Sequence, residues 1–173
     1  MNKERWMREW MTHPKSGISP SPLRLGRFRE PIYFLLNSIT WKPNSEQASQ
    51  FEPVEVPVGF VTDLASIPQI FFALLRPDGD YAYASIVHDY LYWAQMRTRA
   101  TSDQIFKMSM RDFSVARWKL HTIYQAVKWF GCRAWNENAR LKQAGERRFL
   151  KQFPPDALTL WTAWKRRPDV FSD

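Results

Sequence analysis

His88 and Asp89 are adjacent in an otherwise apolar and aromatic stretch, YAYASIVHDYLYWAQM, at residues 81–96. On a helix their side chains point about 100° apart, so both can line one pocket while doing different work. A carboxylate can hold a cation, and an imidazole with an ordinary pKa of about 6.5 can take a proton from water. The pair therefore indicates the chemistry of metal-assisted hydrolysis.

Each of the two residues also has a purely structural interpretation. The helical neighbours of His88 are small or apolar, so it can be a core histidine bonded to a carbonyl or to Ser85. Asp89 has no cation three or four positions away, so it either faces solvent or needs a partner, because burying a lone carboxylate costs several kcal/mol. Both interpretations remain open from the sequence.

Asp63 is the second candidate cation ligand. It lies in GFVTDLASIP, three residues before Ser66, which is a candidate N-cap for the helix SIPQIFFALL. If Ser66 caps that helix, the Asp63 carboxylate is left for a cation; the alternative is that Thr62 or Asp63 is the cap. Asp63 and Asp89 offer only oxygen ligands, which favours calcium.

The motif HDYLY resembles the HDxCY helix of phospholipases A2, and GFVTDLASIP stands where those enzymes have a calcium loop. Residues 99–110 are loosely similar to the second helix of their short bacterial members. The resemblance implies that His88 is the general base, that Asp89 binds calcium, that Asp103 orients His88, and that the Tyr92 hydroxyl bonds to Asp103. A simple helical hairpin would instead place about residue 109 opposite His88, so the first helix must end near Trp93. In the structural alternative, Asp103 simply favours the first turn of its helix.

A second resemblance covers roughly residues 30–131. The order GFVTDLASIP, HDYLY, SDQIF and AVKWFG is similar to a family of phage and prophage proteins marked by GFxTDxASIP and HDxLY motifs. That family is of undefined function, so it groups Asp63, His88, Asp89 and Asp103 without naming a reaction. It implies a phage or prophage origin.

The order of the expected strands and helices predicts an α+β fold, a small antiparallel hairpin or sheet followed by a mainly helical bundle. Residues 30–43 are dense in β-branched and aromatic residues, and residues 54–58 alternate apolar and polar residues with prolines typical of an edge strand, so the two are expected to pair as an antiparallel hairpin. Helices are expected at 1–12, 66–75, 81–96, 101–113 with Thr101 as cap, 115–153 with interruptions at Gly131 or Gly145, and shortly after 154. We expect an arm at 1–25, one domain at 26–153 and a helical appendage at 154–173.

Positive charge is concentrated in the second half of the chain. Of the net charge of +8, residues 97–151 carry 13 Lys or Arg against four Asp or Glu. With Trp129, the cations Arg117, Lys119, Lys128 and Arg133 predict a surface for an anionic partner: nucleic acid, a membrane or an acidic protein. The alternative is a solvated helix whose cations extend over it, with Ile123, Ala126, Val127 and Phe130 as its core stripe.

The remaining composition limits the compartment. The single cysteine, Cys132, rules out a disulfide framework within the chain, no apolar run reaches about 18 residues, and the first residues lack the apolar core of a signal peptide. We expect the host cytoplasm or the phage particle. Two functions are carried forward: a small calcium-assisted hydrolase of phospholipid or another ester, and a non-enzymatic phage accessory or virion protein that binds a host protein or nucleic acid.

Overall fold

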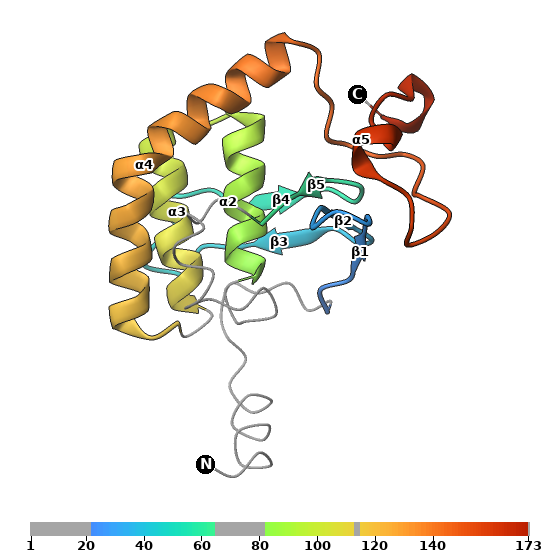
Figure 1. The fold of residues 1–173 in the computed structure, drawn as a ribbon. Coiled ribbons are helices and arrows are strands. Elements are labelled where there is room, and N and C mark those ends of the chain that lie inside the picture. Colours follow the sequence, from blue (N-terminus) through green and yellow to red (C-terminus); the bar gives the residue numbers. More distant parts are fainter. Residues whose placement is uncertain (1–21, 65–81, 113–114, 173) are drawn as a thin grey trace.

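The computed structural model describes residues 22–64, 82–112 and 115–172 of the chain. In this part, five short strands come first and three long helices follow, which confirms the α+β prediction (Figure 1). The helices predicted at 1–12 and 66–75 lie outside the described residues.

The strands form two small antiparallel sheets. In the first, the order is β1-β2-β5, with β1 at Leu25–Arg27, β2 at Tyr33–Leu35 and β5 at Val61–Thr62. In the second, β3 (Ile39–Trp41) pairs with β4 (Val54–Val56), which confirms the predicted hairpin. The single strand predicted at 30–43 is wrong, because a bend at residues 36–37 divides it between the two sheets. The polar pair Asn37 and Ser38 interrupts the apolar run there, and the Asn37 amide bonds to the Ser38 carbonyl.

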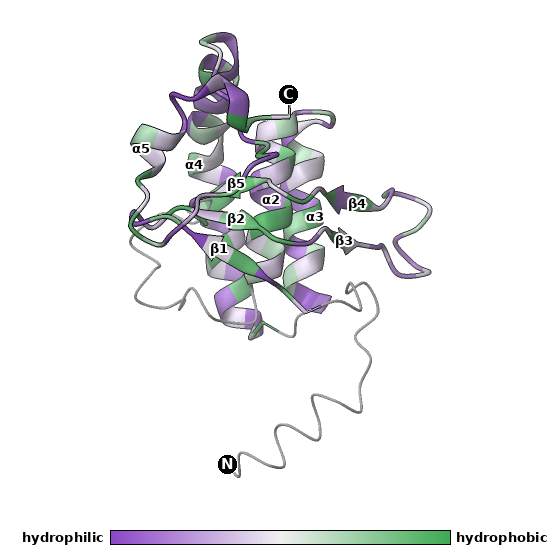
Figure 2. Ribbon diagram, turned by 90° about the vertical axis from the view of Figure 1, so that its right-hand side faces the viewer, coloured by the Kyte–Doolittle hydropathy of each residue, from purple (hydrophilic) through white to green (hydrophobic). Residues whose placement is uncertain are grey.

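The central helix is α2, at Ala82–Ala94, and it is buried along most of its length. It contacts α3 (Arg99–Asp112) and α4 (Arg117–Gln143) on one side and β4 and β5 on the other. Figure 2 shows the hydrophobic colouring of α2 behind β2 and β5. Since α2 is covered by both layers, its polar side chains are held between packed elements instead of facing water.

The turn between α2 and α3 is short and tightly bonded. Gln95 adopts a left-handed φ of 55°, and Thr98 caps α3 by accepting a hydrogen bond from the Thr101 N–H at 3.1 Å. The prediction that Thr101 is the cap is therefore wrong. A threonine one turn earlier takes the role and starts α3 at Arg99.

Helix α4 runs without a break past Gly131 and ends at Gln143, before Gly145, whose φ of 85° suits the end of a helix. Of the two expected interruptions, only the one at Gly145 corresponds to an end of the helix. Ile123, Ala126 and Val127 are buried as predicted, but Phe130 is 63% exposed, so its assignment to the core stripe is wrong.

The residues after α4 return to the first sheet. Phe149 bridges Phe60, and four residues join one hydrophobic cluster with Phe34 of β2 and Val61 of β5, namely Trp161, Trp164, Val170 and Phe171. Helix α5 (Trp161–Trp164) and the 3-10 helix η2 (Pro168–Val170) lie here. The Glu30 carboxylate accepts hydrogen bonds from the N–H groups of Trp161 and Thr162, at 2.7 and 3.2 Å. This cap fastens the C-terminal residues to the loop between β1 and β2.

Candidate functional site

His88 and Asp103 meet between α2 and α3. The His88 Nε2 atom lies 3.1 Å from Asp103 Oδ1, and the two residues are 0% and 4% exposed. The contact forms because α2 ends at Ala94 and a four-residue turn brings the first turns of α3 back alongside it. This is the early helix end that the predicted pairing of these residues requires.

Asp103 gathers three donors on its two carboxylate oxygens. The Tyr92 hydroxyl donates to Oδ1 at 2.5 Å, and the Arg99 guanidinium donates to Oδ2 at 3.0 Å, in addition to the His88 contact. The His88 ring stacks on Phe106, with centroids 4.4 Å apart and planes 17° apart. The contact with Asp103 and the stacking on Phe106 together hold the imidazole in one orientation.

The protonation state of His88 follows from its burial. Removal from water lowers the pKa of His88, and the hydrogen bond and charge of Asp103 only partly oppose that shift. The neutral ring then carries its proton on Nε2, toward Asp103, and presents a lone pair on Nδ1. Burial first, then the hydrogen bond to Asp103, raises the pKa of Tyr92, so its hydroxyl stays a donor.

The Nδ1 atom of His88 is buried and has no hydrogen-bond partner among the described residues. The same holds for the hydroxyl of Ser85, three residues earlier on the same face of α2. Buried polar atoms are nearly always satisfied, by protein or by water, so each of these atoms calls for a partner that the described residues do not supply. His88 is buried in the core, as the structural interpretation holds, but its hydrogen-bond partner among the described residues is Asp103 and not Ser85 or a carbonyl.

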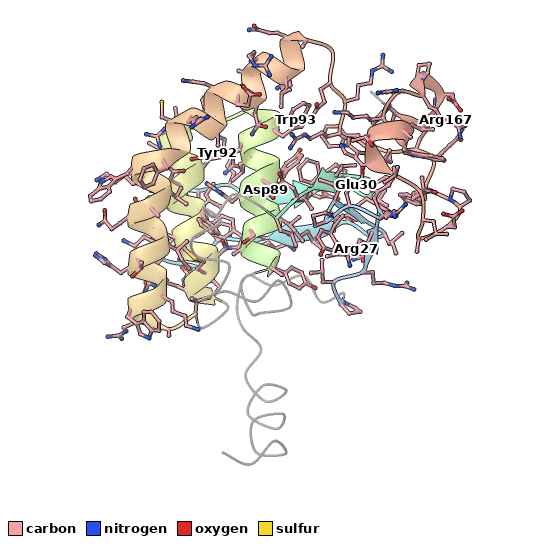
Figure 3. All side chains as sticks on the ribbon, in the orientation of Figure 1. Arg27, Glu30, Asp89, Tyr92, Trp93 and Arg167 are labelled. Carbon is pink, nitrogen blue, oxygen red and sulfur yellow. The ribbon has the colours of Figure 1, made fainter. Side chains whose placement is uncertain are left out.

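Asp89 points to a different neighbour, as the 100° separation predicts. It is 6% exposed and accepts a hydrogen bond from the hydroxyl of Thr62 on β5, so it does not face solvent. The same Thr62 oxygen accepts the Leu64 N–H at 3.0 Å. Figure 3 labels Asp89 and Tyr92, one turn apart on α2. Thr62 was predicted only as a possible helix cap, and no local pattern in the sequence indicated that it bonds to Asp89.

The predicted metal ligands, Asp89 and Asp63, differ in environment. Asp89 is buried and Asp63 is exposed. Over residues 22–64, 82–112 and 115–172, no group of three or more His, Cys, Asp or Glu side chains could hold a metal ion. Calcium takes about six to eight oxygen ligands, so the described side chains do not complete a calcium site by themselves. Calcium binding stays a prediction.

Two residues that sequence analysis did not assign to the site support it. Arg99 lies one turn before Asp103 on α3, a spacing that helical periodicity could have revealed. Gly131 on α4 leaves room for the Tyr92 hydroxyl and the Arg99 guanidinium. Nearby, the Trp135 ring meets the Tyr92 ring edge to face at 5.2 Å. No local pattern in the sequence reveals the role of Gly131.

The predicted partner-binding residues lie on the outer side of α4. Arg117, Lys128 and Arg133 are exposed, and Trp129 is 74% exposed. Lys119 is half-buried, with its amine 5.6 Å from the Trp118 ring. The side of α4 that packs on the bundle carries Ile123, Val127 and Gly131, so the exposed Arg117, Lys128 and Arg133 lie outside this packed stripe, whereas Lys119 lies at its edge.

Comparison with known proteins gives one family and one relative. The family described as "Protein of unknown function (DUF1353)" matches residues 41–127, which include Thr62, His88, Asp89, Tyr92 and Asp103. "Uncharacterized protein y4jT" of Sinorhizobium fredii (strain NBRC 101917 / NGR234) is 37% identical over 78 residues, 44% of this chain. The match covers 23% of that relative, so the chain spans under a quarter of its length.

No solved structure matches. Among the described helices, none has the length and apolar character needed to cross a bilayer.

Proposed function

We propose that this chain, which belongs to the DUF1353 family of proteins of unknown function, is a hydrolase that uses His88 as a general base to cleave an ester. The observation that carries the proposal is the state of the two ring nitrogens. Nε2 is bound to Asp103, while Nδ1 is buried with no partner among the described residues. A base needs this arrangement, with one nitrogen fixed and the other presenting a lone pair.

The proposed reaction begins with a water molecule between His88 Nδ1 and the Ser85 hydroxyl. As the water oxygen attacks the ester carbonyl, Nδ1 takes its proton, and the Asp103 carboxylate stabilises the imidazolium that forms. The same proton then passes to the leaving alkoxide, so that ester and water give acid and alcohol. Tyr92 and Arg99 touch neither water nor ester; they position Asp103.

The substrate class we propose is a phospholipid or another ester, the class implied by the phospholipase A2-like HDYLY helix. A calcium ion held by Asp89, with Asp63, would stabilise negative charge on the substrate. Because the described side chains do not complete that site, the steps above use only the chain's own residues. A phage or prophage origin is part of the same proposal and rests on the GFVTDLASIP and HDYLY motifs.

Ester hydrolysis by purified protein tests the proposal. The wild type is assayed on short-chain and phospholipid esters, with and without calcium, beside His88→Asn, Asp103→Asn and the control His121→Asn on the exposed side of α4. We expect His88→Asn to lower kcat by roughly 10²–10⁴-fold. Asp103→Asn should lower kcat with little change in KM, and the control should match the wild type. Thermal unfolding confirms that each variant is folded.

Two results would overturn the hydrolase. One is a wild type that cleaves none of these esters in either condition, and the other is a folded His88→Asn variant that keeps full activity. Either result would favour the second candidate, a non-enzymatic phage accessory or virion protein. That candidate has its own support in the exposed aromatic and basic side chains of α4.

A further inference from the structure

One side of α4 carries large apolar side chains that no other described element covers. We define the α4 outer face by Arg117, Trp118, Lys128, Trp129 and Arg133. Trp118 is 58% exposed and Trp129 is 74% exposed. Apolar residues scattered singly over a surface need no explanation, but two large rings on one side of a helix do.

The two indole rings point the same way. Trp118 and Trp129 are 11 positions apart, which is about three helical turns, so they lie within about 20° of each other around the axis and about 17 Å apart along it. Helix α4 is 27 residues long and forms an outer edge of the molecule (Figure 1). Both rings can therefore meet a single flat surface at once.

Cations flank the rings on both sides of the helix. Lys128 lies about 80° to one side of Trp118, and Arg133 lies about 60° to the other. Both are exposed, and in the described part of the chain neither forms a salt bridge. The acid on this side, Glu137, is already paired with Arg140 at 2.6 Å. The α4 outer face thus presents net positive charge around protruding indoles.

We propose that the α4 outer face docks on an anionic lipid surface. Proteins that stack single-stranded nucleic acid hold their rings in a basic groove. Here the rings protrude, and the hollow on this side of α4 is lined by Arg133, Asn136, Glu137 and Arg140, with no ring among them. A bilayer interface accepts protruding indoles at the level of the headgroups, while lysine and arginine bind anionic headgroups. The face lies outside the stripe of α4 that packs on the bundle, so this inference does not depend on hydrolysis.

Vesicle co-sedimentation tests the docking. The vesicles are ether-linked phosphatidylglycerol or ether-linked phosphatidylcholine, which contain no acyl ester to cleave. The variants are Trp118→Ala/Trp129→Ala and Lys128→Glu/Arg133→Glu. The matched controls are Leu158→Ser and Arg166→Glu, which change an exposed apolar residue and an exposed cation on the C-terminal residues.

We expect the wild type to bind phosphatidylglycerol but not phosphatidylcholine, with binding that weakens as salt is added. Each α4 double variant should weaken binding by roughly tenfold or more, the controls should not, and His88→Asn should bind like the wild type. Unchanged binding in the Trp double variant would overturn the proposal. Equal binding to both lipids would also overturn it. So would a wild-type protein that binds single-stranded oligonucleotide but does not bind the vesicles.

Discussion

Gly131 on α4 lies directly against the hydroxyl of Tyr92 on α2. A Cβ atom at position 131 would stand 2.4 Å from the Tyr92 oxygen and 3.4 Å from the Arg99 Nη1 atom. These are the two side chains that donate hydrogen bonds to Asp103 beside the His88 contact. The third helix therefore encloses the Asp103 network, and it does so through the absence of a side chain.

Substituting Gly131 with alanine tests this close approach. In the interior of an ordinary helix, Gly→Ala stabilises by up to about 1 kcal/mol. Here we expect the opposite sign, a loss of about 1–3 kcal/mol in the free energy of unfolding, because the new methyl group displaces the Tyr92 hydroxyl. Chemical denaturation measures both Gly131→Ala and the double variant Gly131→Ala/Tyr92→Phe. Removing the hydroxyl should relieve part of the clash, so strict additivity of the two changes would contradict this account.

The Tyr92 hydroxyl can also be removed by itself. Tyr92→Phe deletes a donor to a buried carboxylate, and we expect a loss of about 1.5–3 kcal/mol in the free energy of unfolding. The matched control is Tyr124→Phe on α4, where the hydroxyl makes no hydrogen bond to any residue the structure describes; this change should leave stability nearly unaltered. Urea denaturation compares the two, and equal losses would remove the special role of the Tyr92 hydroxyl.

The buried imidazole predicts a pH dependence of stability. The pKa of His88 is lowered in the folded protein, chiefly by burial, while in the unfolded chain it is about 6.5. Below about pH 6.5 the unfolded state binds a proton that the folded state does not, so stability is full above that pH and falls toward the folded pKa by up to about 1.4 kcal/mol per pH unit. His88→Asn should remove this part of the slope, and His121→Asn should keep it.

The lowered pKa of His88 also predicts the pH profile of activity. A general base with this pKa should stay active below about pH 6.5, so a fall of kcat/KM that begins above that pH would contradict the assignment.

The Glu30 cap predicts how the C-terminal residues are held. Glu30→Ala removes the acceptor of the Trp161 and Thr162 N–H groups, at an expected cost of about 1 kcal/mol. Trypsin should then cut faster after the exposed Arg166. Glu46→Ala, on the exposed loop before β4, is the control. Burial raises the pKa of Glu30, but the hydrogen bonds that its carboxylate accepts from Trp161, from Thr162 and from its own N–H together outweigh burial and lower the pKa, so the cap should persist in mild acid. Unchanged cleavage in Glu30→Ala would mean that the packing of Trp161 and Phe171 alone holds these residues.

Calcium binding is tested separately from catalysis. If Asp89 holds calcium, adding the ion at about 100 times its Kd should stabilise the wild type by about 2.7 kcal/mol, and Asp89→Asn should abolish the shift. Thermal unfolding with calcium, with magnesium and with neither ion measures this. A wild type that does not respond to either ion would remove the metal from the proposal while leaving the roles of His88 and Asp103 to the ester assay.

The pairing of His88 with Asp103 shows how far the sequence reaches. Helical spacing alone places His88 and Tyr92 one turn apart on α2, and the resemblance named Asp103 as the partner of both. That pairing depended on where α2 ends, and the end is set by Gln95 in a left-handed conformation and by the Thr98 cap. The predicted cap was Thr101 instead, because Thr101 and Gln104 have the spacing of a capping box.

The features that could be predicted from the amino-acid sequence alone are local ones. The α+β order, the helical faces of α2 and α4 and the excess of cations after Arg97 depend only on residues a few positions apart, and their periodicity is visible in the sequence. The bond from Thr62 to Asp89 across 27 positions and the space that Gly131 leaves for Tyr92 became visible only in the folded chain. So did the outward position of Phe130, on an apolar helical stripe. Such contacts form when separate elements pack against each other, and packing depends on the combined shape of several elements rather than on the spacing within any one.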